Sequence, residues 1–369
     1  MLSFSSGNTR SVNARRAVLE SLELAAASGH GQPGTVLLCS GYGHDLRELD
    51  QVLRTACPGT RVLATSCAGV IGRDGPGESI HDIALMGLHG DGFRVSHVHG
   101  VNGDGAHACG AALARGLLGT PLPVRMVVLM ACGPDLAGDG LISGIESVLG
   151  SDVVIFGATS TDPMRGAATF MVLEGERVQQ AAFAVGIWDP SLVVESGATH
   201  GFMAIDPPLQ VTRARGNRVH QLDGRPAWAR YLERLGLEPE AGLAATLAIG
   251  ALAEALSPEQ AAAYGNDHIL RAVTDHCPED GALTCSATLR EGQNLWLTLR
   301  DERRIFDDTD RLLQRMVSSH PGRSPVAVFH ADCLARGRRL FDRVMKEELV
   351  HRMQHPLCGS LGVPPWLGL

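Results

Sequence analysis

The 369-residue sequence lacks several features that would place it in a class at once. None of its nine cysteines belongs to a C-x-x-C pair, which argues against a zinc ribbon and suits reduced thiols. No stretch approaches the roughly 18 apolar residues of a membrane helix, and the N-terminal MLSFSSGNTRSVNARRAVLE lacks a signal-peptide core. These absences predict a cytoplasmic protein without a membrane partner.

An excess of positive charge is also missing. Lys and Arg number 32 against 40 Asp and Glu, so the net charge of −8 argues against nucleic acid as a partner. Glycine-rich stretches at 72–79 and 100–110 lack the strand-to-helix context and the Lys-Ser or Lys-Thr of a phosphate loop. With 44% hydrophobic residues, the chain can bury a large core in two domains or one large domain.

The sequence does contain one pattern of secondary-structure elements that occurs three times. Residues 35–72, 126–163 and 325–363 each have an apolar run, a polar turn, a helical segment and a second run ending in small residues. Helical connections favour parallel strands, and loops at the carboxyl ends of such strands commonly form ligand crevices. We therefore expect the turns ATSCAG, FGATSTD, FHADC and PLCGSLG to converge on one cleft.

The segments between these copies alternate in polarity. Residues 80–100, 167–201 and 283–301 have the pattern of antiparallel hairpins, and the Ala-rich residues 239–268 have high helix propensity. The sequence thus predicts an α/β (mixed α+β) fold of mixed β-sheets flanked by helices, built from repeated β-turn-α-β units with inserted hairpins. A boundary near residue 222 is expected to separate domains 1–222 and 223–369.

Two cysteines are candidates for chemistry. A nucleophilic thiol needs a nearby base or a helix N-terminus. Cys67 precedes AGVIGRDGPG, a poor helix start, so Cys67 and Ala68 are interpreted as a pocket wall. Cys333 precedes a helical segment in which Arg336 can lower the thiol pKa. An enzyme with Cys67 or Cys333 as nucleophile and His330 as base is therefore the alternative hypothesis.

The stretch FHADC places His330 and Asp332 at alternate positions of a strand end, on one face. A neutral imidazole oriented by a carboxylate can bind iron. The same pair is also typical of a satisfied hydrogen bond in the core.

Several stretches together resemble FIST domain proteins, which have an N-terminal and a C-terminal FIST module. The likeness covers about residues 30–369 and is carried by DVVIFGATSTDPM, HGFMAIDPPLQVTRARGN, LDGRPAWARYLERLG, LREGQNLWLTLRD and PVAVFHADCLARGRRLF. Family members usually continue past a segment like PPWLGL into an aromatic Gly-Glu strand, which this sequence lacks.

The resemblance implies a non-enzymatic bacterial sensor with modules 1–222 and 223–369. Its ligand would be haem, responding to nitric oxide with His330 on the iron, or an amino-acid-like metabolite. Its signal would pass to a separate partner such as a histidine kinase or a cyclic-nucleotide enzyme. The resemblance and the four turns together select the candidate ligand-binding residues, which are Cys67, Ala68, Thr161, Asp162, His200, Asp332, Cys333 and Arg336.

Overall fold

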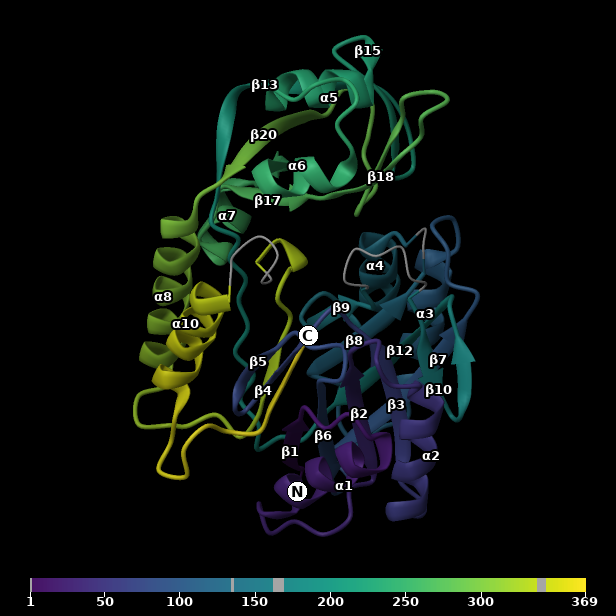
Figure 1. The fold of residues 1–369 in the computed structure, drawn as a ribbon, viewed down its shortest axis with the longest axis vertical. Helices are drawn as coiled ribbons and strands as arrows, with labels where there is room; N and C mark the ends of the chain where they lie inside the picture. The colour runs from purple at the N-terminus through teal and green to yellow at the C-terminus, as the bar shows by residue number, and fades with distance from the viewer. Residues whose placement is uncertain (1, 134–135, 162–168, 337–342) are drawn as a thin grey trace.

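The first half of the chain forms two β-sheets that pack face to face between helices (Figure 1). The computed structural model describes residues 2–133, 136–161, 169–336 and 343–369. The first sheet has the order β1(Ser3–Thr9), β6(Ile83–His89), β2(Thr35–Ser40), β3(Arg61–Ser66), β10(Met171–Leu173) and β11(Glu176–Val178). The second has the order β7(Phe93–His99), β12(Ala181–Ile187), β8(Met126–Cys132) and β9(Val154–Thr159).

The core of this half has three apolar layers. Leu37 and Met86 of the first sheet share a cluster with Met130 and Phe183 of the second. Helices α1(Ala14–Ala26) and α2(Leu46–Ala56) cover the outer face of the first sheet. Helices α3(Ala106–Leu117) and α4(Gly138–Leu149) cover the outer face of the second. The result is an α/β/β/α arrangement.

The local sequence explains these elements. Every residue of β2, β6 and β12 is buried, so these strands are nearly continuous apolar runs with both faces covered. In α2, Leu46, Leu49 and Leu53 recur at helical spacing and are buried. The Asp45 side chain accepts a hydrogen bond from the Arg47 N–H and fixes the start of that helix.

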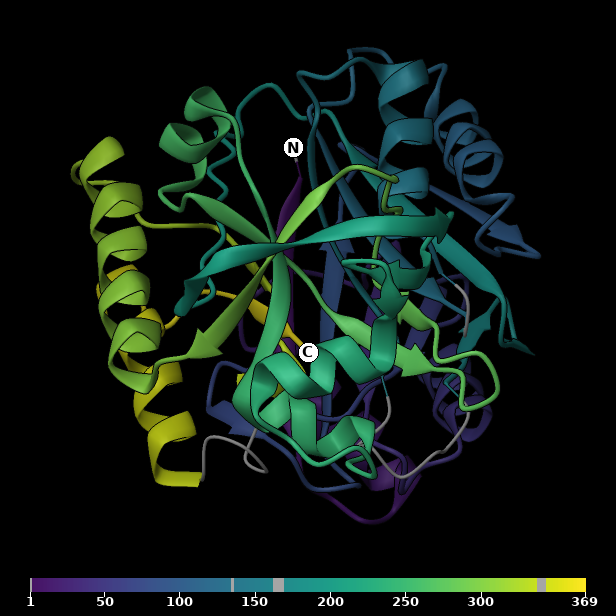
Figure 2. The same ribbon diagram turned by 90° about the horizontal axis from the view of Figure 1, so that it is seen from above.

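The third sheet lies above the first two in Figure 1 and is seen from above in Figure 2. Its strands are β13(Phe202–Arg215), β14(Arg218–Leu222), β15(Arg225–Pro226), β16(Gly250–Ala255), β17(His268–Arg271), β18(Val273–His276), β19(Leu283–Cys285) and β20(Asn294–Arg300). Its helices are α5(Ala227–Leu235), α6(Leu243–Ile249) and α7(Pro258–Tyr264). Since β13 pairs with β20, the sheet takes strands from both sides of residue 222. A domain boundary at that residue stays a prediction.

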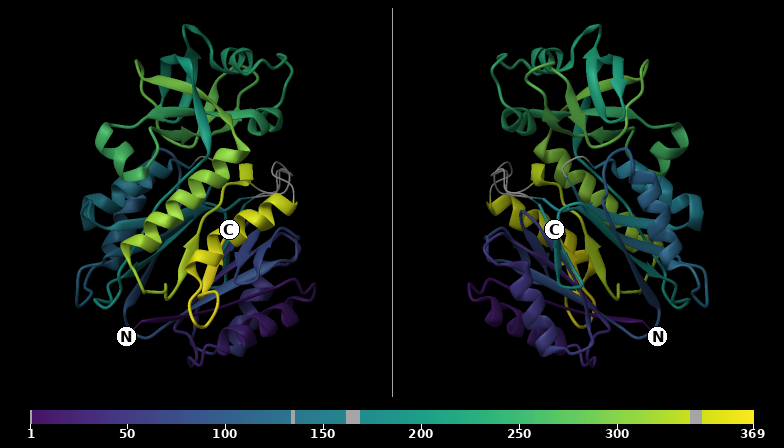
Figure 3. Two further views of the ribbon diagram at one scale, coloured as in Figure 1. Left: turned by 90° about the vertical axis from the view of Figure 1, so that its left-hand side faces the viewer. Right: turned by 90° about the vertical axis from the view of Figure 1, so that its right-hand side faces the viewer.

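A small fourth sheet joins distant parts of the chain. Its order is β21(Val328–His330), β22(Trp366–Gly368), β4(Val70–Gly72) and β5(Gly75–Gly77). Helices α8(Glu302–Ser319) and α10(Arg343–Gln354) run side by side and pack against it (Figure 3). The short helical turns η1(Leu334–Arg336) and η2(His355–Leu357) flank α10 in the chain.

The predicted fold class is confirmed, and so are two of the three strand pairs expected from the repeated plan. Strands β2 and β3, β8 and β9, and β21 and β22 each pair in parallel. In the third copy, however, the second strand is Trp366–Gly368, and the turn PLCGSLG lies before it as η2 and an isolated Gly359–Gly362 bridge.

Two of the three predicted hairpins are wrong. Residues 171–178 do form a hairpin, β10 with β11. Strands β6 and β7 belong to different sheets, because β6 already has β1 and β2 as neighbours. Strands β19 and β20 also do not pair, since β20 lies between β13 and β16.

Among the described residues, none of the helices combines the length and the apolar composition that crossing a bilayer requires.

Candidate functional site

The turns that end β3 and β9 meet, as the repeated plan predicts. The Ala68 N–H donates to Thr161 Oγ1 over 3.2 Å, and the hydroxyls of Thr65 and Ser160 lie 2.6 Å apart. The Tyr42 hydroxyl donates to the Thr161 carbonyl over 3.1 Å. Candidate residues from two copies are thus in direct contact, whereas Asp162 lies outside the described residues. A ligand-binding role for them stays a prediction.

Cys67 lies beneath this contact and is fully buried. Its N–H donates to the Ser40 carbonyl over 3.0 Å, which continues the strand-end geometry into the turn. Burial raises the pKa of the Cys67 thiol well above its ordinary value. A protonated and inaccessible thiol is unsuited to nucleophilic attack, so this geometry favours a packing role.

The third turn carries a buried ion cluster. Asp332 Oδ1 lies 3.0 Å from Arg336 Nε, and Asp332 Oδ2 contacts Lys346 Nζ on α10. All three side chains are 4–7% exposed. Burial raises the pKa of Asp332, but the charges of Arg336 and Lys346 outweigh it and hold that pKa at about 2. Asp332 is therefore an anion shared by two cations.

Lys346 was not among the predicted site residues. It is the only lysine in a chain that otherwise uses arginine for positive charge. The presence of a single lysine was the signal that could have identified this residue. Lys346 lies in a helical segment whose apolar residues indicate core packing, so the segment was interpreted as structural.

His330 belongs to the same cluster but does not hydrogen-bond to Asp332 in the described structure. Its Nδ1 is buried and finds no hydrogen-bond partner within residues 2–133, 136–161, 169–336 and 343–369, and its ring stands edge-on to Trp366 with centroids 5.8 Å apart. Desolvation lowers the pKa of His330 to about 4, against the opposing charge of Asp332. The imidazole is therefore neutral near pH 7.

Cys333 lies beside this cluster. The residue is exposed, yet desolvation of its thiol raises the pKa despite the nearby Arg336. Its ordinary state is the thiol, which gives the alternative nucleophile hypothesis little support.

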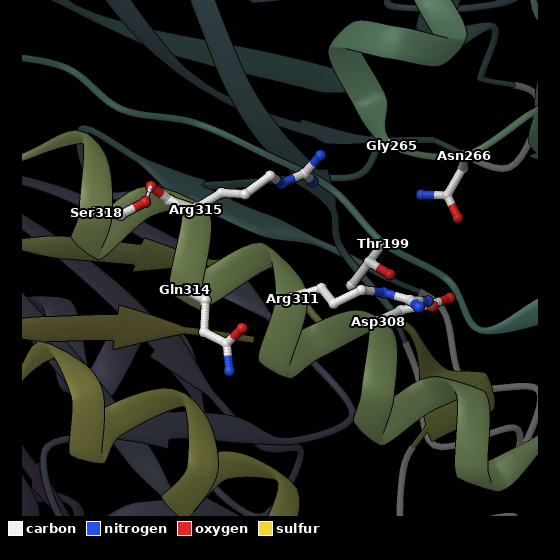
Figure 4. A pocket seen from close by; sticks show the side chains of 8 residues that line it. All are labelled: Thr199, Gly265, Asn266, Asp308, Arg311, Gln314, Arg315 and Ser318. Carbon is white, nitrogen blue, oxygen red and sulfur yellow. Dashed lines mark hydrogen bonds and ion pairs between the residues drawn. The ribbon is translucent and has the colours of Figure 1, made fainter.

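An open cavity of about 400 Å³ lies between α8, the segment before β13 and the turn from α7 to β17 (Figure 4). It is lined by Thr199, Gly265, Asn266, Asp308, Arg311, Gln314, Arg315 and Ser318. Arg311 forms an ion pair with Asp308, and Arg315 Nη2 donates to the Tyr264 carbonyl over 3.4 Å. Apart from Gly265, the lining residues have polar or charged side chains, with two arginines against one aspartate.

Gly265 shapes this cavity through its backbone. It ends α7 in the left-handed conformation with φ +72°, which L side chains rarely adopt. The Arg315 guanidinium lies where a Cβ on Gly265 would stand. Glycine thus lets the arginine of α8 close over the α7 turn.

The predicted residue His200 follows Thr199 at the wall of this cavity. Its Nε2 donates to the His268 carbonyl over 3.0 Å, and its Nδ1 accepts from the Phe202 N–H over 3.0 Å. Burial lowers the pKa of His200, although the bond to His268 opposes this. The neutral ring therefore fixes the segment that carries Thr199.

Thr199 also connects the cavity to the ion cluster. Arg336 Nη1 donates to the Thr199 carbonyl over 3.5 Å. The predicted residues His200, Asp332 and Arg336 are thus brought into one region, while Ala68 and Thr161 form another contact. The arginines of the cavity were missed, because charged residues on an amphipathic helix have the pattern of a solvated face.

The haem expectation finds no support in the described residues. His330 lines neither the large cavity nor a second cavity of about 70 Å³, which is lined by Arg10, Pro76, Glu78, Ser79, Asp82, Lys346 and Glu347. In the described residues no group of three or more His, Cys, Asp or Glu side chains is placed to hold a metal ion. Haem binding stays an untested prediction.

Comparison with known proteins gives two family matches. The model of the FIST N domain matches residues 35–225, and that of the FIST C domain matches residues 227–362. "Uncharacterized protein MJ1623" of Methanocaldococcus jannaschii is 34% identical over 93 residues, which are 25% of this chain and 18% of that protein. The chain thus spans about a fifth of the length of this relative.

Proposed function

Because the chain belongs to the FIST family, we propose that it is a sensory protein whose input is a small anionic metabolite held in the cavity beside α8. The signal then passes to a separate protein such as a histidine kinase or a cyclic-nucleotide enzyme. The single observation that carries the ligand class is the pair of arginines, Arg311 and Arg315, on one wall of the cavity (Figure 4).

The charges of the cavity support an acidic ligand with polar groups. Asp308 balances Arg311, whereas the Arg315 guanidinium forms, within the described residues, one long hydrogen bond to the neutral Tyr264 carbonyl. A planar guanidinium with free donors suits bidentate binding of a carboxylate. Asn266, Gln314 and Ser318 offer further donors and acceptors. An amino-acid-like metabolite satisfies this set, with its ammonium directed to Asp308.

The position of the cavity suits a sensor. Its walls come from three segments that are distant in the sequence: α8, the α7 turn and the segment before β13. A ligand that contacts all three favours the conformation in which they are close together, and that differential affinity is what shifts an equilibrium between two states.

Ligand binding is tested by thermal unfolding with a panel of amino acids and short carboxylic acids. A ligand that binds only the folded state raises the melting temperature in a concentration-dependent way. We expect Arg315→Gln to abolish the rise and Arg303→Gln, an exposed arginine of α8 outside the cavity, to retain it. A rise that is equal in both variants would contradict the proposed site.

The haem version of the sensor has its own test. Protein expressed with a haem precursor would show a Soret band that His330→Ala removes or shifts. A colourless protein contradicts it.

A further inference from the structure

Resting on the proposed function, we infer that the ligand is an acid with anionic groups at both ends. Arg315 and Arg311 bind the outer group, and Arg336 with Thr199 receives the inner one. The observation behind this inference is a third arginine, Arg336, behind the cavity wall.

Arg336 is 5% exposed, and its guanidinium is only partly used. Nε faces Asp332 and Nη1 donates to the Thr199 carbonyl, but Nη2 is buried and has no hydrogen-bond partner among the residues that the structure describes. A buried guanidinium donor without an acceptor costs free energy, so a nearby acceptor is strongly favoured.

The Asp332 carboxylate is not available to Arg336 alone, because Lys346 contacts its other oxygen. Asp332 is thus shared between Arg336 and Lys346, and a second anionic group beside Arg336 improves the charge balance at that guanidinium. His330 adds no positive charge there, because its lowered pKa keeps it neutral near pH 7.

Thr199 stands between this arginine and the cavity. It lines the cavity, its carbonyl accepts from Arg336, and its own Oγ1 is buried with no partner in the described part of the chain. Arg336 does not line the cavity itself, but its guanidinium and the Thr199 hydroxyl lie together at this wall, and the two groups suit a carboxylate or phosphate oxygen that enters here. The mouth offers Arg315 and Arg311.

The experiment compares acids that differ in one charge. Calorimetric titrations of the full chain use malonate, succinate, glutarate and adipate, each against the monocarboxylate of equal length at constant ionic strength. We expect at least one diacid to bind about tenfold tighter than its matched monoacid, the gain of one charge-assisted contact. In 3-phosphonopropionate a phosphonate replaces one carboxylate of succinate, so comparing the two tells a phosphate-bearing ligand from a dicarboxylate.

Two variants assign the inner group. Arg336→Gln removes the guanidinium, and Thr199→Val removes the hydroxyl without the change in buried charge that Arg336→Gln brings. Both should reduce the diacid preference, measured as the ratio of diacid to monoacid affinity, whereas Arg315→Gln should lose both ligands. A diacid preference that survives in both inner variants overturns the assignment to Arg336 and Thr199.

The two proposals fail differently. If the wild-type protein binds diacids and monoacids equally and both need Arg315, only the inference of a doubly charged ligand is overturned. Absence of binding by every acid in both this series and the amino-acid panel overturns the anionic sensor proposal as well.

Discussion

Lys346, the only lysine of the chain, contacts Asp332 from 14 positions further along the sequence, and both side chains are buried. Asp332 in turn pairs with Arg336, whose guanidinium reaches the cavity wall at Thr199. This cluster joins α10 to the end of β21 and to the segment leading into the third sheet.

Removing the carboxylate should therefore destabilise the fold. Asp332→Asn leaves two buried cations without their shared anion, and the expected loss in the free energy of unfolding is about 3–5 kcal/mol by urea denaturation. Asp310→Asn is the matched control, because its ion pair with Arg352 is solvent-exposed and should matter little. Similar losses in the two variants would contradict the buried cluster.

The solitary lysine also gives a chemical test. Lys346 is buried against Asp332, so amine-reactive reagents should leave it unmodified in the folded protein and modify it after denaturation. Mass spectrometry of the peptide containing Lys346 measures the extent of acetylation. Rapid acetylation under native conditions would place Lys346 at the surface instead.

The close contact of α3 with α4 depends on glycine. A Cβ on Gly144 would overlap the His107 carbonyl, so Gly144→Ala should cost about 2 kcal/mol or more of unfolding free energy. Gly138, at the start of the same helix, has open space and no positive φ, so Gly138→Ala should gain about 0.5 kcal/mol. Equal effects in chemical denaturation would show that the two helices do not pack this closely.

We expect the free energy of unfolding to fall on mild acidification, because several buried histidines are neutral in the folded protein. The pKa values of His44, His89, His200 and His330 are all lowered, chiefly by desolvation, and that of His330 is about 4. The unfolded chain binds these protons from about pH 6.5 downward while the folded chain does not, so the free energy of unfolding decreases as the pH falls toward 4.

The variant His330→Leu isolates one of these groups. It removes a proton site that only the unfolded chain fills in this range, so the stability curve between pH 6.5 and 4 should become flatter. His107→Leu, at an exposed helical position, is the control and should leave the slope unchanged. A slope that His330→Leu does not change would mean that His330 titrates normally in the folded state.

The sequence predicted the strand-helix-strand units well because they are local. Apolar runs such as TVLLCS, separated by one amphipathic helix, dictate a parallel pair over short chain distances. It failed where partners are distant: alternation marks β6 and β20 as strands, but their neighbours are set by the whole sheet. Residues 250–255 form a central strand despite their helix propensity, since Ala251 and Ala253 are small and buried beside β20.

The candidate site was predictable only in part for the same reason. Asp332 and Arg336 lie four positions apart, so their proximity follows from the local chain. The approach of Arg315 to the α7 turn across 51 positions depends on Gly265 and on the packing of α8, which no local pattern encodes.

The most direct test of this account is a crystal structure of the protein soaked with the tightest-binding acid from the titrations. The account predicts that its carboxylate lies within hydrogen-bond distance of Arg315, in the cavity bounded by Thr199 and Asn266. A ligand found instead at the strand-end turns around Ala68 and Thr161 would contradict it and return the site to the crevice expected from the repeated plan.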